Sequence, residues 1–167
     1  MVSNSAAPSV VTRAAQPYVG IRCEVTMDTI AAAGDRLPEV FGWLGERGIA
    51  PADAPFFKYD VIDMAATLVI EVGVPVAEPV EGEGDIVAGI LPAGRYATVT
   101  HVGHPDELAG VTGELLSWAE GQGLQFDYRL AEEGEVWACR LEVYHTDPTV
   151  EPDMNKWETT LLFRLAD

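Results

Sequence analysis

The sequence is poor in basic residues. Ten Lys and Arg residues stand against 27 Asp and Glu, giving a formal net charge of −17 over 167 residues. Such a charge repels a phosphate backbone, because proteins bind nucleic acids by releasing counterions to clustered Lys and Arg. Direct nucleic-acid binding by this chain is therefore not expected. The charge favours cationic ligands, or it simply keeps the protein soluble.

Long apolar runs and export signals are also missing. No stretch reaches the roughly 18 apolar residues that a bilayer span requires, and residues 1–15 lack a basic start followed by an apolar run. We expect no membrane partner and a cytoplasmic location. The two cysteines, Cys23 and Cys139, lie in apolar strand-like contexts, and buried free thiols are favoured over a disulfide.

The apolar content is sufficient for one folded domain. Hydrophobic residues make up 48% of the chain, and a chain of this length can bury a sizeable core. The segment 3–9 is small and polar with one proline, so we expect residues 1–15 to be a flexible N-terminal arm. Residues 16–167 are expected to form a single domain.

An internal repeat organises this domain. In the first repeat, residues 16–78, strands are expected at 18–26, 56–62 and 67–76 from their alternating apolar pattern. A helix is expected from Asp28 to Gly48, and Pro38 should kink or divide it.

The second repeat, residues 85–167, has the same order of elements. A strand over 85–101 is interrupted near Pro92, a helix covers 105–121, and strands cover 136–145 and 157–165. Each repeat is thus β-α-β-β, and the acidic segment 79–85 is read as a solvated linker. The expected fold is α+β: tandem β-α-β-β repeats form an antiparallel sheet with two helices on one face and a ligand groove on the other.

Strand alternation selects the side chains of the groove. The apolar faces of 68–76 and 157–165 should pack on the helices, which leaves Glu71 and Glu158 opposite. In the preceding strand, Cys139, Leu141 and Val143 are taken as the core face. The groove residues predicted from that strand are then Arg140, Glu142 and Tyr144.

Three carboxylates and a tyrosine on one concave face suit a flat, hydrophobic, cationic guest. An alternative stays open: the face is exposed to water, Glu71 and Glu142 are solvated, and Arg140 neutralises one of them.

Four motifs together resemble a known family. They are LPAGRYATVTHVGHPDEL (91–108), LLSWAEGQGL (115–124), VYHTDP (143–148) and KWETTLLFRL (156–165). As an ensemble they are similar to the second repeat of the GyrI-like small-molecule-binding domain, whose superfamily includes the effector-binding domains of AraC-type and multidrug-sensing bacterial regulators. The resemblance implies two β-α-β-β units with a ligand groove between them.

The resemblance also implies roles for individual residues. Glu158 takes the place of the central pocket glutamate, with Tyr96 and Tyr144 as aromatic neighbours. Alternation puts three further aromatic candidates on the core side unless a bulge intervenes; they are Phe57, Trp137 and Trp157.

The expected function is a standalone effector-binding domain, because no helix-turn-helix segment precedes Tyr18 or follows Leu165. It would bind hydrophobic, cationic or aromatic small molecules around Glu158, as a sensor or a sequestering protein. The resemblance also implies an alternative, because some members of the superfamily are hydrolases of cyclopropane-bearing natural products; Glu158 would then be the base and Tyr144 the proton donor. A third possibility is action through contact with another protein. The sequence leaves the oligomeric state open.

No cofactor or metal is expected. His101 and His104 flank a glycine, but no recognised pattern of Cys or acidic ligands accompanies them. Haem binding of the kind seen in the related SOUL-type fold is disfavoured, because no histidine is predicted on the groove face.

Overall fold

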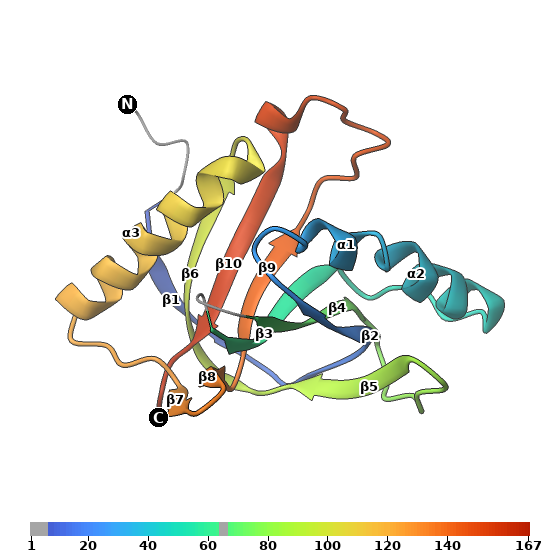
Figure 1. The fold of residues 1–167 in the computed structure, drawn as a ribbon, viewed down its shortest axis with the longest axis horizontal. Coiled ribbons are helices and arrows are strands. Elements are labelled where there is room, and N and C mark those ends of the chain that lie inside the picture. The colour runs from blue at the N-terminus through green and yellow to red at the C-terminus, as the bar shows by residue number, and fades with distance from the viewer. Residues whose placement is uncertain (1–6, 64–66) are drawn as a thin grey trace.

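A computed structural model describes residues 7–63 and 67–167. One antiparallel sheet in the order β1-β6-β10-β9-β3-β4-β2-β5 runs through the domain, and β7 and β8 form a hairpin attached to β3 (Figure 1). The strands are β1 (Ser9–Arg13), β2 (Gln16–Val25), β3 (Phe56–Ile62), β4 (Leu68–Pro75), β5 (Ile86–Leu91), β6 (Gly94–Val102), β7 (Tyr128–Ala131), β8 (Gly134–Trp137), β9 (Arg140–Tyr144) and β10 (Glu158–Arg164). The helices are α1 (Ala31–Gly34), α2 (Leu37–Glu46) and α3 (Leu108–Gly121), with short 3-10 turns at Pro105–Glu107 and Met154–Lys156.

The α+β fold with two β-α-β-β repeats is confirmed. The first repeat is β2, α1–α2, β3 and β4, and the second is β6, α3, β9 and β10, with β7 and β8 between α3 and β9. Pairing of β3 with β9 joins the repeats into one sheet. As expected, the first helical segment is divided, and Pro38 lies in the first turn of α2, where its missing N–H costs no hydrogen bond.

All three helices pack against the same side of the sheet, which we call the helix face. Val40 and Leu44 of α2 and Val111 and Leu115 of α3 share one buried cluster with alternate residues of the strands. The other side, here called the open face, has an apolar cluster of its own, to which Phe56, Leu141 and Leu162 belong. Both faces of the central strands are therefore buried.

The N-terminal segment differs from the expectation. Ser9–Arg13 form β1 and pair with β6 from Thr98 to Gly94, so the prediction of a flexible arm is wrong for these five residues. These residues contain only two adjacent valines among polar residues, a pattern too short to stand out in the sequence, and the edge of β6 gives this strand its partner. Residues 1–6, which also belong to the predicted arm, lie outside the described residues.

Candidate functional site

The predicted ligand-binding residues are divided between the two faces of the sheet. Ladder partners in an antiparallel pair lie on the same face, and Glu142 pairs with both Leu161 and Phe57. Leu161 belongs to the cluster beneath the helices. The residues on the helix face are Phe57, Trp137, Glu142 and Tyr144. Those on the open face are Glu71, Tyr96 and Glu158.

The prediction that Glu142 and Tyr144 share a face with Glu158 is therefore wrong. Leu141 pairs with Leu162, on the open face. The apolar residues of β9 do not face the helices. Alternation shows which side chains share a face, but it cannot tell two buried faces apart. Here the open face is also apolar, so the assignment was inverted.

Glu158 is a solvent-exposed residue at the start of β10, where it pairs with Val102. Its backbone N–H donates to Thr146 Oγ1 at 2.9 Å. Within the described residues, its carboxylate has no ion pair or side-chain hydrogen bond. Trp157 is tied to the preceding loop, since its indole N–H donates to the Glu151 carbonyl at 2.7 Å.

Glu71 is buried on the open face with its own countercharge. It accepts a hydrogen bond from the Tyr18 hydroxyl at 2.6 Å, and Lys58 Nζ lies 3.4 Å from its other oxygen. Lys58 also pairs with Asp60. Burial raises the pKa of Asp60 to about 7, with its contact to Glu71 adding to the effect and Lys58 opposing it. Glu71 thus has both a hydrogen-bond donor and a countercharge within the protein.

Tyr96 is also occupied within the protein. It is 2% exposed, and its hydroxyl donates to the Pro92 carbonyl at 2.6 Å. That bond closes the turn between β5 and β6.

Glu142 on the helix face lies in a different environment. The hydroxyls of Tyr59 and Tyr144 both donate to its Oε1, at 2.9 and 2.7 Å. Burial first, and then the charge of Glu142, raise the pKa of both tyrosines well above the usual value. Both phenols therefore stay protonated and remain donors to the carboxylate.

Glu142 forms no direct ion pair with the described residues, although Arg140, on the same face of β9, is near enough for the two charges to attract each other. No Lys, Arg or His nitrogen in the described ranges lies within 4.0 Å of its carboxylate, and Oε2 receives no hydrogen bond from them. A half-buried carboxylate held by neutral hydroxyls, with one oxygen uncommitted, can accept a positive group from outside.

Aromatic rings surround this carboxylate. Phe57 packs edge-to-face on Tyr144 with ring centroids 5.2 Å apart, and α1 passes over it at Gly34. Toward β8, the Arg140 guanidinium lies 4.8 Å from the ring centre of Trp137 and 4.5 Å from that of Phe163. Burial lowers the pKa of Arg140. The guanidinium of Arg140 thus already makes cation–π contacts with the aromatic rings at this site.

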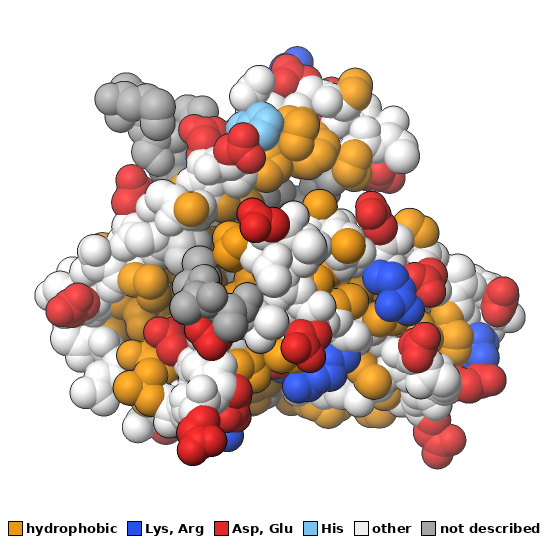
Figure 2. Space-filling model, viewed as in Figure 1, with side chains coloured by type: hydrophobic (Ala, Val, Ile, Leu, Met, Phe, Trp, Pro, Cys, Tyr) orange, Lys and Arg blue, Asp and Glu red, His pale blue; other side chains and the backbone are white. Residues whose placement is uncertain are grey.

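A cleft of about 590 Å³ adjoins the cluster at Arg140 and Trp137. It lies between the C-terminal half of α3 and the β7–β8 hairpin. On the helix face, apolar side chains are visible between the ridge of α3 and α1–α2 (Figure 2). A volume of 300–1,000 Å³ is typical of sites for small organic ligands. The lining residues are Leu116, Glu120, Leu124, Gln125, Phe126, Tyr128, Leu130, Glu135, Trp137 and Arg140.

Neither Tyr59 nor the β7–β8 hairpin was predicted from the sequence. Glu142 and Tyr144 were found because residues two apart in a strand share a face. Tyr59 is 83 positions away from Glu142, and its contribution depends on the pairing of β3 with β9.

No metal site or membrane span is visible in residues 7–63 and 67–167. No group of three or more His, Cys, Asp or Glu side chains there could hold a metal ion, and no helix is long and apolar enough to cross a bilayer. His104 caps the 3-10 turn that follows it, by accepting from the Asp106 N–H at 3.1 Å.

A duplicated β-α-β-β sheet with a cleft beside its seam defines a class of ligand-binding α+β domains. The model of the GyrI-like small molecule binding domain matches residues 6–166, and the chain belongs to this family. No curated protein matches the sequence.

Solved structures with the same fold have low sequence identity. EcmrR in a complex with DNA aligns with a TM-score of 0.78 and 19% identity over 98% of this chain, which spans 58% of that protein. SAV2435 bound to tetraphenylphosphonium aligns with a TM-score of 0.64 and 12% identity, covering 96% of this chain and 94% of that one. A hydrolase from Listeria innocua aligns with a TM-score of 0.64 and 14% identity, covering 95% and 91%.

Proposed function

We propose that the chain binds hydrophobic organic cations on its helix face, with Glu142 as the countercharge, and acts as a sensor or sequestering protein. The observation that carries the proposal is that two tyrosine hydroxyls donate to Glu142, while no nitrogen of a basic side chain in the described residues lies within 4.0 Å of its carboxylate. A ligand's positive centre would supply the missing charge at Oε2. Its apolar groups would contact Phe57, Tyr144 and the adjoining cleft.

The balance of charges supports a bulky cation. A small ion such as ammonium would lose its hydration without gaining enough contacts. A large delocalised cation carries little hydration and gains ring contacts, worth about 0.5–2 kcal/mol each. SAV2435, which has the same fold, has been solved with tetraphenylphosphonium, a ligand of this class.

Glu158 is not the residue we propose for this role. It is exposed, and it lies on the opposite face from Tyr144. In water, an exposed carboxylate attracts a cation only weakly. Glu142 therefore replaces Glu158 as the proposed centre of the site, and Glu158 provides a matched control.

The test is titration of the protein with tetraphenylphosphonium, followed by tryptophan fluorescence. We expect Glu142→Gln to weaken binding about 10- to 100-fold, because a charge-assisted contact contributes about 1.5–3 kcal/mol. Glu158→Gln removes the same charge and should bind like the parent. Parent-like binding by Glu142→Gln, with loss in Glu158→Gln, would assign the site to the open face instead.

A second candidate function uses the same residues. Glu142 and Tyr144 are hydrogen bonded at 2.7 Å, so a base and a proton donor stand side by side. A structural neighbour is described as a hydrolase. If the chain opens strained cyclopropane rings, Glu142 takes the role of base expected for Glu158. Mass spectrometry would then show one water added to a cyclopropane-bearing compound after incubation with the parent, and an unchanged compound with Glu142→Gln.

A further inference from the structure

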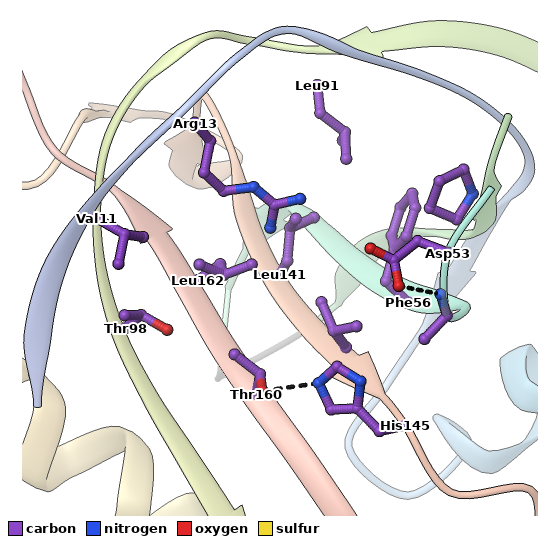
Figure 3. Close-up of a pocket in the computed structure, with 13 residues that line it drawn as sticks. Val11, Arg13, Asp53, Phe56, Leu91, Thr98, Leu141, His145, Thr160 and Leu162 are labelled. Atoms are coloured by element: carbon purple, nitrogen blue, oxygen red, sulfur yellow. Dashed lines mark hydrogen bonds between the residues drawn. The ribbon is translucent and has the colours of Figure 1, made fainter. Parts of the chain in front are cut away.

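The open face carries a separate pocket of about 190 Å³ that the proposed function does not use (Figure 3). Its floor is formed by β9, β10 and β3, and β1 and the end of β5 form its rim. Glu142 and Tyr144 project to the other side of the same sheet. A ligand here would bind independently of one at the Glu142 site.

The floor of this pocket is apolar and closely packed. Phe56, Leu141 and Leu162 are 1%, 2% and 5% exposed and belong to the open-face cluster. Leu91 closes the upper side in Figure 3. Such walls favour an apolar body and offer it no hydrogen bonds.

Arg13 is the arginine that lines this pocket. Its side chain extends from β1 into the space above Leu141 and Leu162 (Figure 3). No hydrogen bond or ion pair joins its guanidinium to any of the described residues. A guanidinium has five donors in a planar fork that matches a carboxylate. The pocket therefore presents an uncommitted bidentate anion receptor above an apolar floor.

Further polar groups lie on the side of the pocket away from Leu91. Thr160 Oγ1 lies 2.8 Å from His145 Nε2 and 2.8 Å from Thr100 Oγ1. Thr98 adds another hydroxyl to the lining. Hydroxyls of this kind can donate to a carboxylate oxygen or to a substituent on the ring beside it.

The remaining charges restrict the class of anion. Asp53 also lines the pocket, with its Oδ1 accepting from the Ala54 N–H at 2.8 Å. Together with the net charge of −17, it opposes phosphates and other multiply charged anions. A single carboxylate can be matched by Arg13 alone.

The volume limits the apolar body to about one ring. A cavity of roughly 150 Å³ lined by Leu, Ile and Phe holds a benzene molecule, and this pocket is somewhat larger. We infer that the open-face pocket binds a small monocarboxylic acid with a single aromatic ring or an apolar group of that size. The carboxylate lies on Arg13, and the ring lies on Phe56, Leu141 and Leu162.

Benzoate is the probe for this inference, and backbone amide chemical shifts in NMR are the readout. Saturable shifts should concentrate at Thr98, Thr160 and Leu162. Arg13→Gln should weaken benzoate at least about tenfold, since hydrogen bonds to charged groups contribute about 1.5–3 kcal/mol. Arg129→Gln removes the same charge from an exposed position on β7 and should bind like the parent.

Two further comparisons separate this site from its alternatives. Benzamide keeps the size of benzoate but has no charge, and it should bind at least about tenfold more weakly. Glu142→Gln should leave benzoate binding unchanged even if it abolishes binding of tetraphenylphosphonium. The inference is overturned if Arg13→Gln binds benzoate like the parent, if benzamide matches benzoate, or if the shifts map to the helix face. Thermal unfolding of each variant shows whether it is folded.

Discussion

At the scale of single residues, the structure separates the carboxylates by how each is balanced. Glu71 lies beside Lys58 and accepts a hydrogen bond from Tyr18, whereas Glu158 is exposed to solvent. Glu142 accepts hydrogen bonds from two tyrosine hydroxyls. The sequence could identify all three, because a carboxylate within a strand is unusual. It could not show which carboxylate lacks a basic side chain in direct contact, since the contacts are made by residues of other strands.

The buried Asp60 makes a prediction about pH and stability. Its pKa is raised to about 7, from an ordinary value of 3.8, first by burial. The folded state therefore holds this proton more tightly than the unfolded chain does. The free energy of unfolding should fall as pH rises from about 4 to about 7 and then level off. Burial acts to raise the pKa of Glu71, but its hydrogen-bond partners and Lys58 lower it overall. Glu71 is therefore ionised in both states between pH 5 and 7.

Denaturant unfolding between pH 5 and 8 tests this expectation. Asp60→Asn should lose less stability over that range than the parent, because the titrating group is absent. Asp28→Asn, at an exposed position, should keep the slope of the parent. Equal slopes for Asp60→Asn and the parent would contradict the assignment.

At the scale of helices and strands, periodicity predicted most elements because each has one dominant apolar pattern. The strand 56–62 agrees with β3, and the break near Pro92 separates β5 from β6 at Gly94, whose φ is 147°. Strands β1, β7 and β8 are four or five residues long, which is too short for alternation to be distinctive. They exist because neighbouring strands offer them an edge.

The central strands contain a glycine that the open-face core requires. Gly73 on β4 pairs with Phe56. A Cβ at this position would lie 2.6 and 2.8 Å from two atoms of the Phe56 ring and 3.3 Å from Tyr18. Phe56 is 1% exposed and packs edge-to-face on Tyr18 with centroids 5.4 Å apart, so the ring has no free space to enter.

We therefore expect Gly73→Ala to lower the free energy of unfolding by about 1–3 kcal/mol, the usual cost of overpacking. Gly113→Ala is the matched control. That glycine lies in α3 with nothing within 4 Å of the added Cβ, so the change should stabilise the protein by about 0.5–1 kcal/mol. Chemical denaturation measures both variants. A parent-like Gly73→Ala would mean that Phe56 can move.

At the scale of the whole molecule, the duplication could be predicted from the order of elements. In the sheet, the two repeats meet where β3 pairs with β9. The face of the sheet that carries Glu142 and Tyr144 was not predictable. It depends on which of two buried faces receives the helices, and the residues of β9 fit either arrangement. The two proposed sites lie on opposite faces of the same strands, one for a cation and one for a small acid.

The net charge of −17 makes a prediction for the molecule as a whole. Acidic side chains are spread over the helix face in Figure 2, with few basic groups among them. Their mutual repulsion destabilises the compact state, and salt screens it over a Debye length of about 10 Å at 0.1 M. Raising KCl from about 10 mM to about 300 mM should therefore raise Tm by about 2–5 °C.

The control for this effect is a variant with fewer acidic groups. Glu78, Glu81 and Glu132 are exposed and make no ion pair with the described residues, so changing all three to Gln removes repulsion without breaking a contact. This variant should have a higher Tm than the parent at low salt, and its Tm should depend less on KCl. A Tm that falls with added KCl would mean that favourable ion pairs, such as that of Arg164 with Asp127, outweigh the repulsion among the carboxylates.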